Sequence, residues 1–473
     1  MAKAEKPKKE KSKHPFRDNI EVVVFAIVMA MGLKVFAVEA YQIPTGSMQP
    51  TLMGTELLDE INKVTDGGLH DRVLVDKISY WFRDPVRWEV VVFRYPLLAH
   101  NNYVKRLIGM PGEELWIESG DIYTRPIGTN GEFEIQRKPW NVQEHLWKHV
   151  LPGVGDDETK WPGWRTAGNL RHEDDGTQSF LGEASIEYGA AIRDLYLHGY
   201  PEEIYFRLPS PATRSNKKVS DLRSIFEVKG DAPASDLRYE LEIGHYELNL
   251  AIHPGGAYTL ELPDGGRTEG QLPRLASGTE IDLAYWDHTV RLALDGEEVF
   301  YRELEIKPTK VSRNGIRFAS TGGGWKVSPL TVQRDIHYLP PRDNSTPLFQ
   351  VPEGNYFMMG DNTQNSLDSR DWTAEILEFD PPVNGVEKLR GDRMIGGVDP
   401  MFNNPRWNRD RTVMTFRDEY GGLYTFTDKQ MQEASDIMQP AGLVPRNYVL
   451  GRAIAVFLPV PPFAPVVRMG LVH

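Results

Sequence analysis

One long apolar run stands near the start of the chain, at residues 20–38 (IEVVVFAIVMAMGLKVFAV). It holds two charged residues, Glu21 and Lys34, and Lys34 lies close enough to one end to reach the lipid headgroups. Because a bilayer span needs about 20 mostly apolar residues and a helix satisfies its own backbone there, the run predicts a transmembrane helix. Two alternatives stay open: the apolar part of a cleaved signal peptide, with Ala37 and Ala40 at the cleavage site, and a buried core helix.

The residues before this run are strongly basic. Residues 1–17 carry seven Lys or Arg and two Glu, and we expect residues 1–19 to form a cytoplasmic tail. Since Lys and Arg stay on the cytoplasmic side of a membrane, everything after Val38 is expected to lie outside it.

After the apolar run the pattern changes to short alternating segments. Residues 72–82 and 88–96 are rich in β-branched and aromatic residues, and a turn-like spacer separates them. Residues 101–124 predict two strands about a Gly-Met-Pro-Gly turn. Residues 39–124 therefore predict the first part of an antiparallel, mainly β domain.

A second series of strands follows a stretch without clear periodicity. Residues 125–180 are rich in Trp, His, Gly and acidic residues, and we expect an irregular insert there. Residues 181–345 contain many short alternating segments, including a hairpin about Asp295 and Gly296. They predict an inserted β-sandwich of the jelly-roll type, so the expected fold class is mainly β behind one transmembrane helix.

Three later segments complete the expected organisation. Residues 346–374 are dense in Gly, Asp, Asn and Ser and are expected to return to the first β domain. Residues 375–442 are polar and irregular, which indicates a second insert. Residues 443–473 add a last strand and a tail, and the prolines of that tail exclude a second membrane span.

The composition narrows the classes of partner and chemistry. The 473 residues have a formal net charge of -13, which disfavours nucleic acid as a partner, because binding phosphates needs clustered Lys and Arg. The chain has no cysteine, which excludes disulfides, thiolate zinc sites and a cysteine nucleophile. No convincing set of Asp or Asn ligands stands out, so we expect no metal and no cofactor.

The stretch YQIPTGSMQPTLMG (41–54) holds a small hydroxyl, Ser47, directly after the apolar run. A serine nucleophile needs a base, and none of the 12 His lies in a motif-like stretch. A lysine can serve if burial lowers its pKa. Lys105 is the candidate, because strand alternation places it on the same side as Tyr103 and Leu107. Taken alone, a turn serine and a surface lysine would be the plainer explanations.

Five blocks occur in order behind the apolar run: PTGSMQPTL, DRVLVDKISY, WEVVVFRYP, NYVKRLIGMPGE and GDNTQNSLDSRDW. In this order they resemble the type I signal peptidases (leader peptidases), Ser/Lys-dyad serine proteases of the bacterial envelope. The resemblance covers residues 16–120, 350–372 and 443–459. It implies an endopeptidase of the bacterial inner membrane, with its N-terminus in the cytoplasm and its catalytic domain outside. Its substrates would be exported preproteins, cleaved after a small-x-small site.

The resemblance also implies a role for each matching residue. Ser47 would attack the scissile carbonyl, and Lys105 would take its proton and later return it to the leaving amine. The Ser47 N–H and the Thr45 hydroxyl would stabilise the oxyanion, and Ser366 would orient the Lys105 amine. The residues implied to brace the site are Asp368, Arg370 and Arg106.

The chain departs from the family pattern in three places. Thr363 and Gln364 stand where the family commonly carries Arg and Asp, and Trp88 stands where it usually carries Gly. A long segment separates Trp372 from Leu443, whereas the corresponding family blocks are almost adjacent. None of these departures removes a group implied in catalysis.

Substrate recognition is expected at strand edges. An extended peptide can add as a strand beside residues 42–44 and 103–105, where shallow apolar pockets would accept small side chains. The residues expected to bind substrate are Gln42, Ile43, Pro44, Met48, Leu52, Tyr103 and Val104.

The role of the insert is the most open part of the sequence. Residues 279–304 resemble the concanavalin A-like (laminin-G-like) jelly rolls, which implies a glycan ligand, a protein ligand or a spacer. Two other functions stay open: a catalytically inactive relative that binds envelope components through the insert, and a self-cleaving regulatory protease of a related Ser/Lys class. The intact Ser47, Lys105 and Ser366 disfavour the first, and the predicted span disfavours the second.

Overall fold

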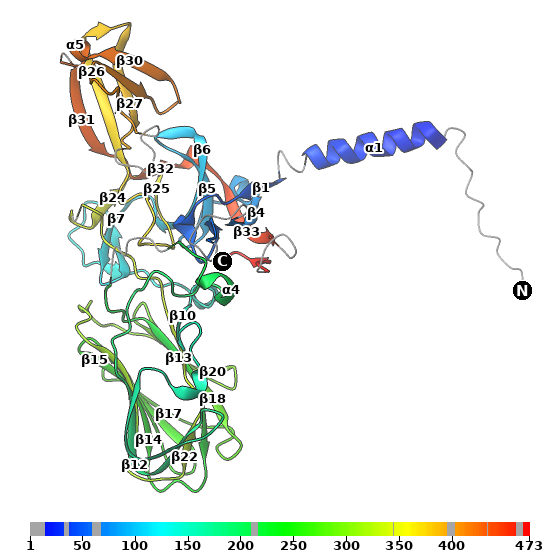
Figure 1. The fold of residues 1–473 in the computed structure, drawn as a ribbon, viewed down its shortest axis with the longest axis vertical. Coiled ribbons are helices and arrows are strands. Elements are labelled where there is room, and N and C mark those ends of the chain that lie inside the picture. The colour runs from blue at the N-terminus through cyan, green and yellow to red at the C-terminus, as the bar shows by residue number, and fades with distance from the viewer. Residues whose placement is uncertain are drawn as a thin grey trace, which may run out of the picture.

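The computed structural model describes residues 15–32, 37–58, 68–209, 216–343, 345–394, 403–432, 434–459 and 467–473. Strands dominate these residues, and every paired strand in them runs antiparallel to its neighbour. Figure 1 shows a column of three β bodies, with helix α1 (Pro15–Gly32) extending away from the middle one. The prediction of a mainly β protein is confirmed.

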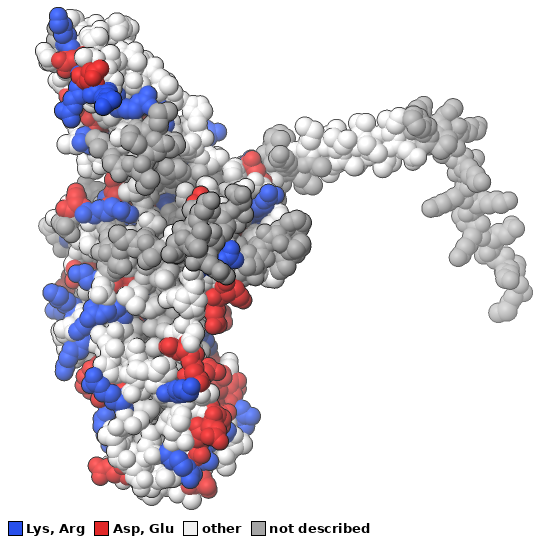
Figure 2. Space-filling model, in the orientation of Figure 1, with Lys and Arg blue, Asp and Glu red and all other residues white. Residues whose placement is uncertain are grey.

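Helix α1 carries an exposed apolar surface. Among its exposed side chains are Val22, Phe25 and Val28, and Figure 2 shows most of the helix without charged groups. Within the described ranges, however, no helix is both long and apolar enough to span a bilayer. The predicted span includes residues 33–36, and the predicted tail includes residues 1–14; both segments lie outside the described residues. The transmembrane helix therefore stays a prediction.

The middle body is a sheet assembled from three distant parts of the chain. Its strands, in spatial order, are β1 (Val38–Gln42), β4 (Arg72–Asp76), β33 (Val449–Leu458), β5 (Val90–Tyr95), β6 (Leu98–Gly109), β25 (Asn355–Met359) and β32 (Leu443–Pro445), with β34 (Gly470–Leu471) beside β33. Alternation along β5 decides its packing: Val91, Phe93 and Tyr95 join one apolar cluster, and Val90 joins another. Since both faces of the sheet are covered, its central strands are mostly buried.

A smaller sheet lies beside this body and connects it to the insert. Its strands are β24 (Leu348–Val351), β7 (Glu113–Glu118), β8 (Asp121–Pro126) and β9 (Glu134–Ile135). Leu115 and Ile117 of β7 share an apolar cluster with Leu146, Ile336 and Tyr338, which come from the two ends of the insert. The two ends of the insert therefore pack against the smaller sheet and the middle body.

The insert forms the lower body of Figure 1. Its strands are β10 (Lys148–Leu151), β11 (Trp164–His172), β12 (Gln178–Tyr188), β13 (Leu222–Gly230), β14 (Leu237–Ile243), β15 (Tyr246–Ile252), β16 (Ala257–Glu261), β17 (Arg267–Gln271), β18 (Thr279–Trp286), β19 (Thr289–Leu294), β20 (Glu297–Glu303), β21 (Asn314–Ser320), β22 (Trp325–Val327) and β23 (Thr331–Arg334). Strand β12 pairs with β21 through one half and with β22 through the other, so it belongs to both halves of the network.

The two halves of this network pack face to face. Phe226 of β13 stacks on Tyr239 of β14 with ring centroids 5.2 Å apart, although these strands are not paired in the sheet order. Phe226 also meets Phe318 of β21 edge-on at 4.9 Å. One shared core of alternating buried side chains results, which is the packing of a β-sandwich.

The sandwich begins earlier than the sequence predicted. Residues 125–180, expected to be irregular, contain β10, β11 and the start of β12, and all three pair within the sandwich. Strand β11 is exposed along most of its length, so it shows no apolar alternation. A strand that is exposed on both faces gives no period-2 signal, and this is why the pattern missed it.

The second insert is also more regular than expected. It contains one sheet of β26 (Thr373–Val383), β27 (Val386–Asp392) and β31 (Ala434–Pro440), and another of β28 (Arg406–Trp407), β29 (Val413–Arg417) and β30 (Leu423–Thr427). Leu377, Phe416 and Phe426 form part of its own small core. Its many polar residues lie on exposed strand faces, which concealed the alternation in the sequence.

Candidate active site

Ser47 lies in a short turn whose base is fixed by apolar packing. It is the middle residue of a 3₁₀ turn, η2 (Gly46–Met48), between two extended residues. Met48 is fully buried beside Ile43 and Leu52, and the Leu52 N–H donates to the Met48 carbonyl at 2.9 Å. Ser47 itself is only half-buried. The turn therefore anchors the following side chain in the core and leaves the serine near the surface.

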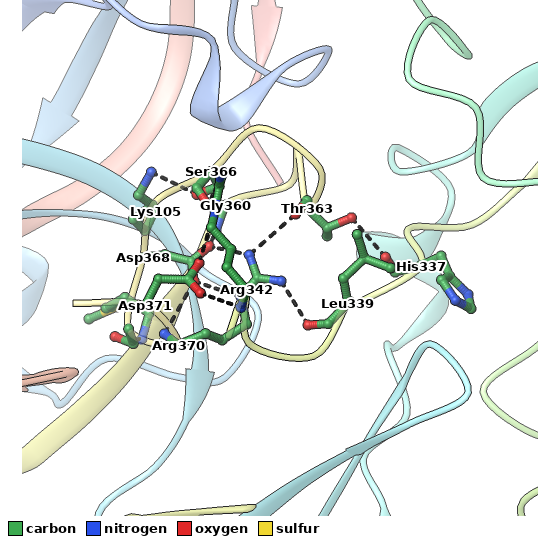
Figure 3. Close-up of polar contacts among 12 residues, drawn as sticks. Lys105, His337, Leu339, Arg342, Gly360, Thr363, Ser366, Asp368, Arg370 and Asp371 are labelled. Atoms are coloured by element: carbon green, nitrogen blue, oxygen red, sulfur yellow. Dashed lines mark hydrogen bonds and ion pairs between the residues drawn. The ribbon is translucent and has the colours of Figure 1, made fainter. Parts of the chain in front are cut away.

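Lys105 is a buried lysine on strand β6. Its side chain is 3% exposed, and its amine donates a hydrogen bond to Ser366 Oγ at 3.1 Å (Figure 3). Burial lowers the pKa of Lys105 to about 8, while the nearby Asp368 carboxylate opposes the shift and Arg370 adds to it. A substantial fraction of this amine is therefore neutral near pH 8 and able to accept a proton.

The loop that carries Ser366 also holds the Ser47 turn. The Asn362 N–H donates to the Ser47 carbonyl at 3.1 Å, and Asn362 Nδ2 donates to the Gly46 carbonyl at 2.8 Å. A Cβ atom on Gly360 would lie 2.3 Å from both the Ser47 carbonyl oxygen and Ser366 Oγ, so this close approach requires glycine. Turn η2 also lies against β6. The fold thus brings Ser47, Lys105 and Ser366 into one place.

Asp368 and Arg370 form a buried ion pair under this loop. The guanidinium donates to both carboxylate oxygens at 2.7 Å, and the Gly360 N–H donates to Asp368 Oδ2 at 3.0 Å (Figure 3). Burial alone would raise the pKa of Asp368, but the Arg370 charge holds it below its ordinary value. The pair fixes the loop from beneath, with the Arg370 guanidinium also donating to the Leu339 carbonyl at 2.8 Å.

Arg106 braces the site through a partner that the sequence did not assign. It donates to both carboxylate oxygens of Asp361, at 2.8 and 2.7 Å, and neither side chain is exposed. The Thr51 hydroxyl donates to the same carboxylate at 2.6 Å. Asp361 is not among the residues that the sequence implied to brace the site. The available signal was Arg106 itself, because a buried guanidinium beside Lys105 needs a carboxylate.

The expected substrate-binding residues fall into separate places. Ile43 and Val104 lie in or against one apolar cluster, where Ile43 is 4% exposed and Val104 is half-buried. Met48 and Leu52 belong to the same cluster but are fully buried, so they support the Ser47 turn from inside. Tyr103 faces away from this cluster and stacks on Tyr95 at 4.4 Å. The structure therefore does not bring Tyr103 together with Ile43.

Two strand edges near Ser47 are open. In the described sheet, β1 pairs with β4 alone, and Gln42 and Pro44 at its end are exposed, as is Thr45. Among the described strands, β5 is the sole partner of β6 between Asn102 and Lys105, because β25 joins β6 only from Arg106 onward. Unpaired N–H and C=O groups on such edges can bind an extended peptide.

A group of buried acids lies where the insert meets β8. Carboxylate oxygens of Asp121, Asp221 and Asp287 lie within 4.8 Å of one another, an arrangement that can hold a cation. The Lys138 amine already lies 2.7 Å from Asp287 and 2.8 Å from Asp335. The absence of a metal therefore stays a prediction.

Comparison with known proteins gives matches to part of the chain. The family model "Signal peptidase, peptidase S26" matches residues 16–145 and 292–384. The chain is 37% identical over 109 residues to "Probable signal peptidase I-2" of Synechocystis sp., covering 22% of this chain and 43% of the relative. It is 35% identical over 148 residues to "Signal peptidase I" of Pseudomonas aeruginosa, covering 26% of this chain and 46% of the relative. The chain thus spans about half the length of these relatives.

Among solved structures, the chain aligns with the metal-free Emp46p carbohydrate recognition domain. The match has a TM-score of 0.27 and 11% identity, and covers 38% of this chain and 93% of that one. These values are too low to support an inference about the insert's ligand. The resemblance to type I signal peptidases is confirmed by the sequence matches.

Proposed function

We propose that this chain removes N-terminal signal peptides from exported preproteins, with Ser47 as nucleophile and Lys105 as general base. One observation carries the proposal. The buried Lys105 amine is hydrogen-bonded to Ser366, and the Ser47 turn packs against β6, the strand that carries Lys105. The low pKa of Lys105, about 8, supports its use as a base. The matches to signal peptidases supply the reaction class.

The proposed reaction proceeds through an acyl-enzyme. Ser47 Oγ attacks the scissile carbonyl carbon while the neutral Lys105 amine takes the hydroxyl proton. The C–N bond then breaks, and the Lys105 ammonium returns this proton to the leaving amine. A water molecule next attacks the Ser47 ester, with Lys105 again accepting and then releasing a proton. Ser366 orients the amine through the two half-reactions.

The oxyanion formed in each step needs hydrogen-bond donors. We assign this role to the Ser47 backbone N–H and the Thr45 hydroxyl. The exposure of Thr45 and its lack of a capping bond to the 3₁₀ turn support the assignment, because its hydroxyl is then available to substrate. Asp368 with Arg370 and Arg106 with Asp361 hold the surrounding backbone in place.

Substrate would bind as an added strand between the open edges of β1 and β6. The exposed Gln42 and Pro44 would contact the peptide backbone, and Ile43 with Val104 would limit the size of the side chains before the scissile bond. This arrangement favours cleavage after a small-x-small sequence. The full burial of Met48 and Leu52 and the orientation of Tyr103 assign these three residues to supporting positions instead.

We place the protein in the bacterial inner membrane, with the catalytic body outside. The apolar, exposed surface of α1 and the position of Ser47 shortly after β1 support a site close to the lipid surface. A preprotein still held by its own apolar segment would present its cleavage site at the same depth. The glycan or protein ligand predicted for the inserted sandwich stays a prediction, on which this function does not depend.

The test uses the full chain in detergent and a preprotein with an Ala-x-Ala cleavage site. Wild type should release the mature protein, and Ser47→Ala and Lys105→Met should each lower the rate to background. Ser119→Ala and Lys326→Met, on turns or strands outside the site, serve as matched controls and should cleave normally. Mass spectrometry of the product locates the cut bond.

Two results would overturn the proposal. Cleavage at the wild-type rate by Lys105→Met would show that Lys105 is not the general base. Loss of activity in a histidine variant would then indicate that this histidine is the base. A wild-type chain that folds but leaves every such preprotein intact would favour the inactive relative with a binding insert.

A further inference from the structure

The side chain after the Ser47 turn is held by the insert. Gln49 is 2% exposed, and its Oε1 accepts hydrogen bonds from Tyr200 at 2.9 Å and from Tyr196 at 3.2 Å. The Gln49 amide folds back over the turn, because a Cβ on Gly46 would lie 2.6 Å from Gln49 Oε1. Two tyrosines of the insert thus fix the residue that packs directly against the backbone before Ser47.

The loop that carries Ser366 is held by the insert as well. Lys148, a buried residue of β10, donates from its amine to the Asp361 carbonyl at 3.1 Å. The Thr363 hydroxyl donates to the His337 carbonyl at 2.8 Å (Figure 3), and Gln364 Nε2 donates to the Asp194 carbonyl. Three residues of this loop, Asp361, Thr363 and Gln364, are therefore hydrogen-bonded to the insert.

Apolar packing joins the same two regions. Met53, Leu57 and Leu69 of the catalytic body share one buried cluster with Tyr200, Ile204 and Leu208 of the insert. The Leu58 N–H also donates to the Arg207 carbonyl at 2.7 Å. The insert segment around α4 (Glu202–Tyr205) is therefore part of the core beneath the Ser47 loop.

We propose that the part of the insert in contact with these two loops is needed for catalysis. Tyr200 is the positioning residue for the Ser47 turn, and Lys148 is the positioning residue for the Ser366 loop. They contact neither substrate nor the reacting atoms, and they act through Gln49 and Asp361. The two loops meet at the Asn362–Ser47 hydrogen bond, so an error in either loop moves Ser47 relative to Lys105. This inference rests on the proposed function for its effect on rate, although the loop contacts themselves do not.

The test compares Tyr200→Phe and Lys148→Met with two controls on the insert. Tyr258→Phe changes a buried tyrosine away from the catalytic loops, and Lys326→Met changes an exposed strand lysine. We expect Tyr200→Phe to lower kcat for the Ala-x-Ala preprotein by about 3- to 10-fold with KM changed less than about twofold, the loss of one positioning hydrogen bond. The controls should keep wild-type values.

A double variant separates positioning from general stability. In a Gln49→Ala background, Tyr200→Phe should cause no further fall in kcat, because the hydroxyl acts through the missing amide. If the two single effects multiply instead, Tyr200 does not work through Gln49 and the inference is wrong.

Amide hydrogen exchange gives a readout that needs no activity. In Tyr200→Phe, the amides of residues 46–53 should exchange about fivefold faster than in wild type. In Lys148→Met, the amides of residues 360–366 should show the same increase. The exchange rates of the sandwich core should be unchanged in both variants. Wild-type exchange in both segments would overturn the inference even if the enzyme is active. An inactive wild-type chain would refute the proposed function, and the exchange result would still decide whether the insert holds the loops.

Should Lys148→Met fail to fold, Gln364→Leu takes its place, since it removes the bond to the Asp194 carbonyl.

Discussion

The Lys105 amine and Ser366 Oγ lie 3.1 Å apart, although 261 positions separate them in the sequence. The whole inserted sandwich lies between them in the chain, and yet the hydrogen bond is formed in the middle body. The strands that deliver them, β6 and β25, are adjacent in one sheet. The chain therefore leaves this sheet at β6 and re-enters it at the neighbouring strand β25, which lets a large domain be accommodated without separating the two side chains.

Replacing Ser366 by alanine should slow the reaction without abolishing it. The Lys105 amine would keep its burial but lose its hydrogen bond to the Ser366 hydroxyl. Loss of a buried hydrogen bond costs about 1–3 kcal/mol, so kcat should fall by about 5- to 150-fold with little change in KM. Steady-state cleavage of an Ala-x-Ala preprotein measures this, with Ser345→Ala, an exposed serine, as the control. An unchanged kcat would show that Ser366 does not orient the base.

The rate should rise with pH through the Lys105 pKa. Only the neutral amine can accept the Ser47 proton, and burial sets its pKa to about 8. Below about pH 8, kcat/KM should therefore increase about tenfold for each pH unit, and above that value it should level off. The measurement is kcat/KM from pH 6 to 10, restricted to the range in which circular dichroism shows the folded chain. A profile that is flat across pH 6 to 9 would contradict a lysine base.

The parts of the site that lie in short local motifs could be predicted from the sequence. The Ser47 turn, Lys105 on its strand, and the block around Asp368 and Arg370 each depend on residues within a few positions of one another. The alternation that places Tyr103 and Leu107 on one side of β6 is also present, because both pack against the same aromatic and apolar cluster.

Pairings between distant segments could not be predicted. Nothing local to Arg106 identifies Asp361 as its partner, and nothing local to Gln49 indicates Tyr200. Thr363 and Gln364, which depart from the family pattern, donate hydrogen bonds to carbonyls of the insert. These carbonyls come within reach only once the insert has folded. The exposed strand β11 was missed because its burial does not alternate.

Trp88 stands where the family usually carries glycine, and its backbone has a conformation that glycine would favour. Its φ is +75°, and its indole donates to the Arg137 carbonyl at 3.1 Å and stacks near Tyr338. Trp88→Gly would relieve about 1 kcal/mol of backbone strain but lose about 3–5 kcal/mol of buried packing. We expect a net loss of about 2–4 kcal/mol in the free energy of unfolding by urea denaturation. Trp407→Gly, a partly exposed strand tryptophan, is the control and should cost less. A more stable Trp88→Gly variant would show that strain outweighs packing.

The acid cluster beneath the insert should make the protein less stable as the pH rises. Burial and the neighbouring Asp221 charge raise the pKa of Asp121 well above its ordinary value, and burial with the Asp287 charge raises that of Asp221 to about 7. Unfolded aspartates release their protons near pH 4, so between about pH 4 and 7 these two carboxyl groups bind more protons in the folded chain than in the unfolded chain. The contribution of these two groups to the free energy of unfolding must therefore fall across this range.

Asp121→Asn tests this origin of the pH dependence. None of the ion pairs in the described part of the chain includes Asp121, whereas Asp287 is paired with Lys138. Removing the Asp121 charge should raise the free energy of unfolding at pH 8 more than at pH 5, because the carboxyl is charged in the folded chain only at the higher pH. Urea denaturation at pH 5 and pH 8 measures both effects, with Asp231→Asn, an exposed aspartate of the insert, as the control. A variant that is less stable than wild type at pH 8 would mean that the folded chain needs this carboxylate as an anion.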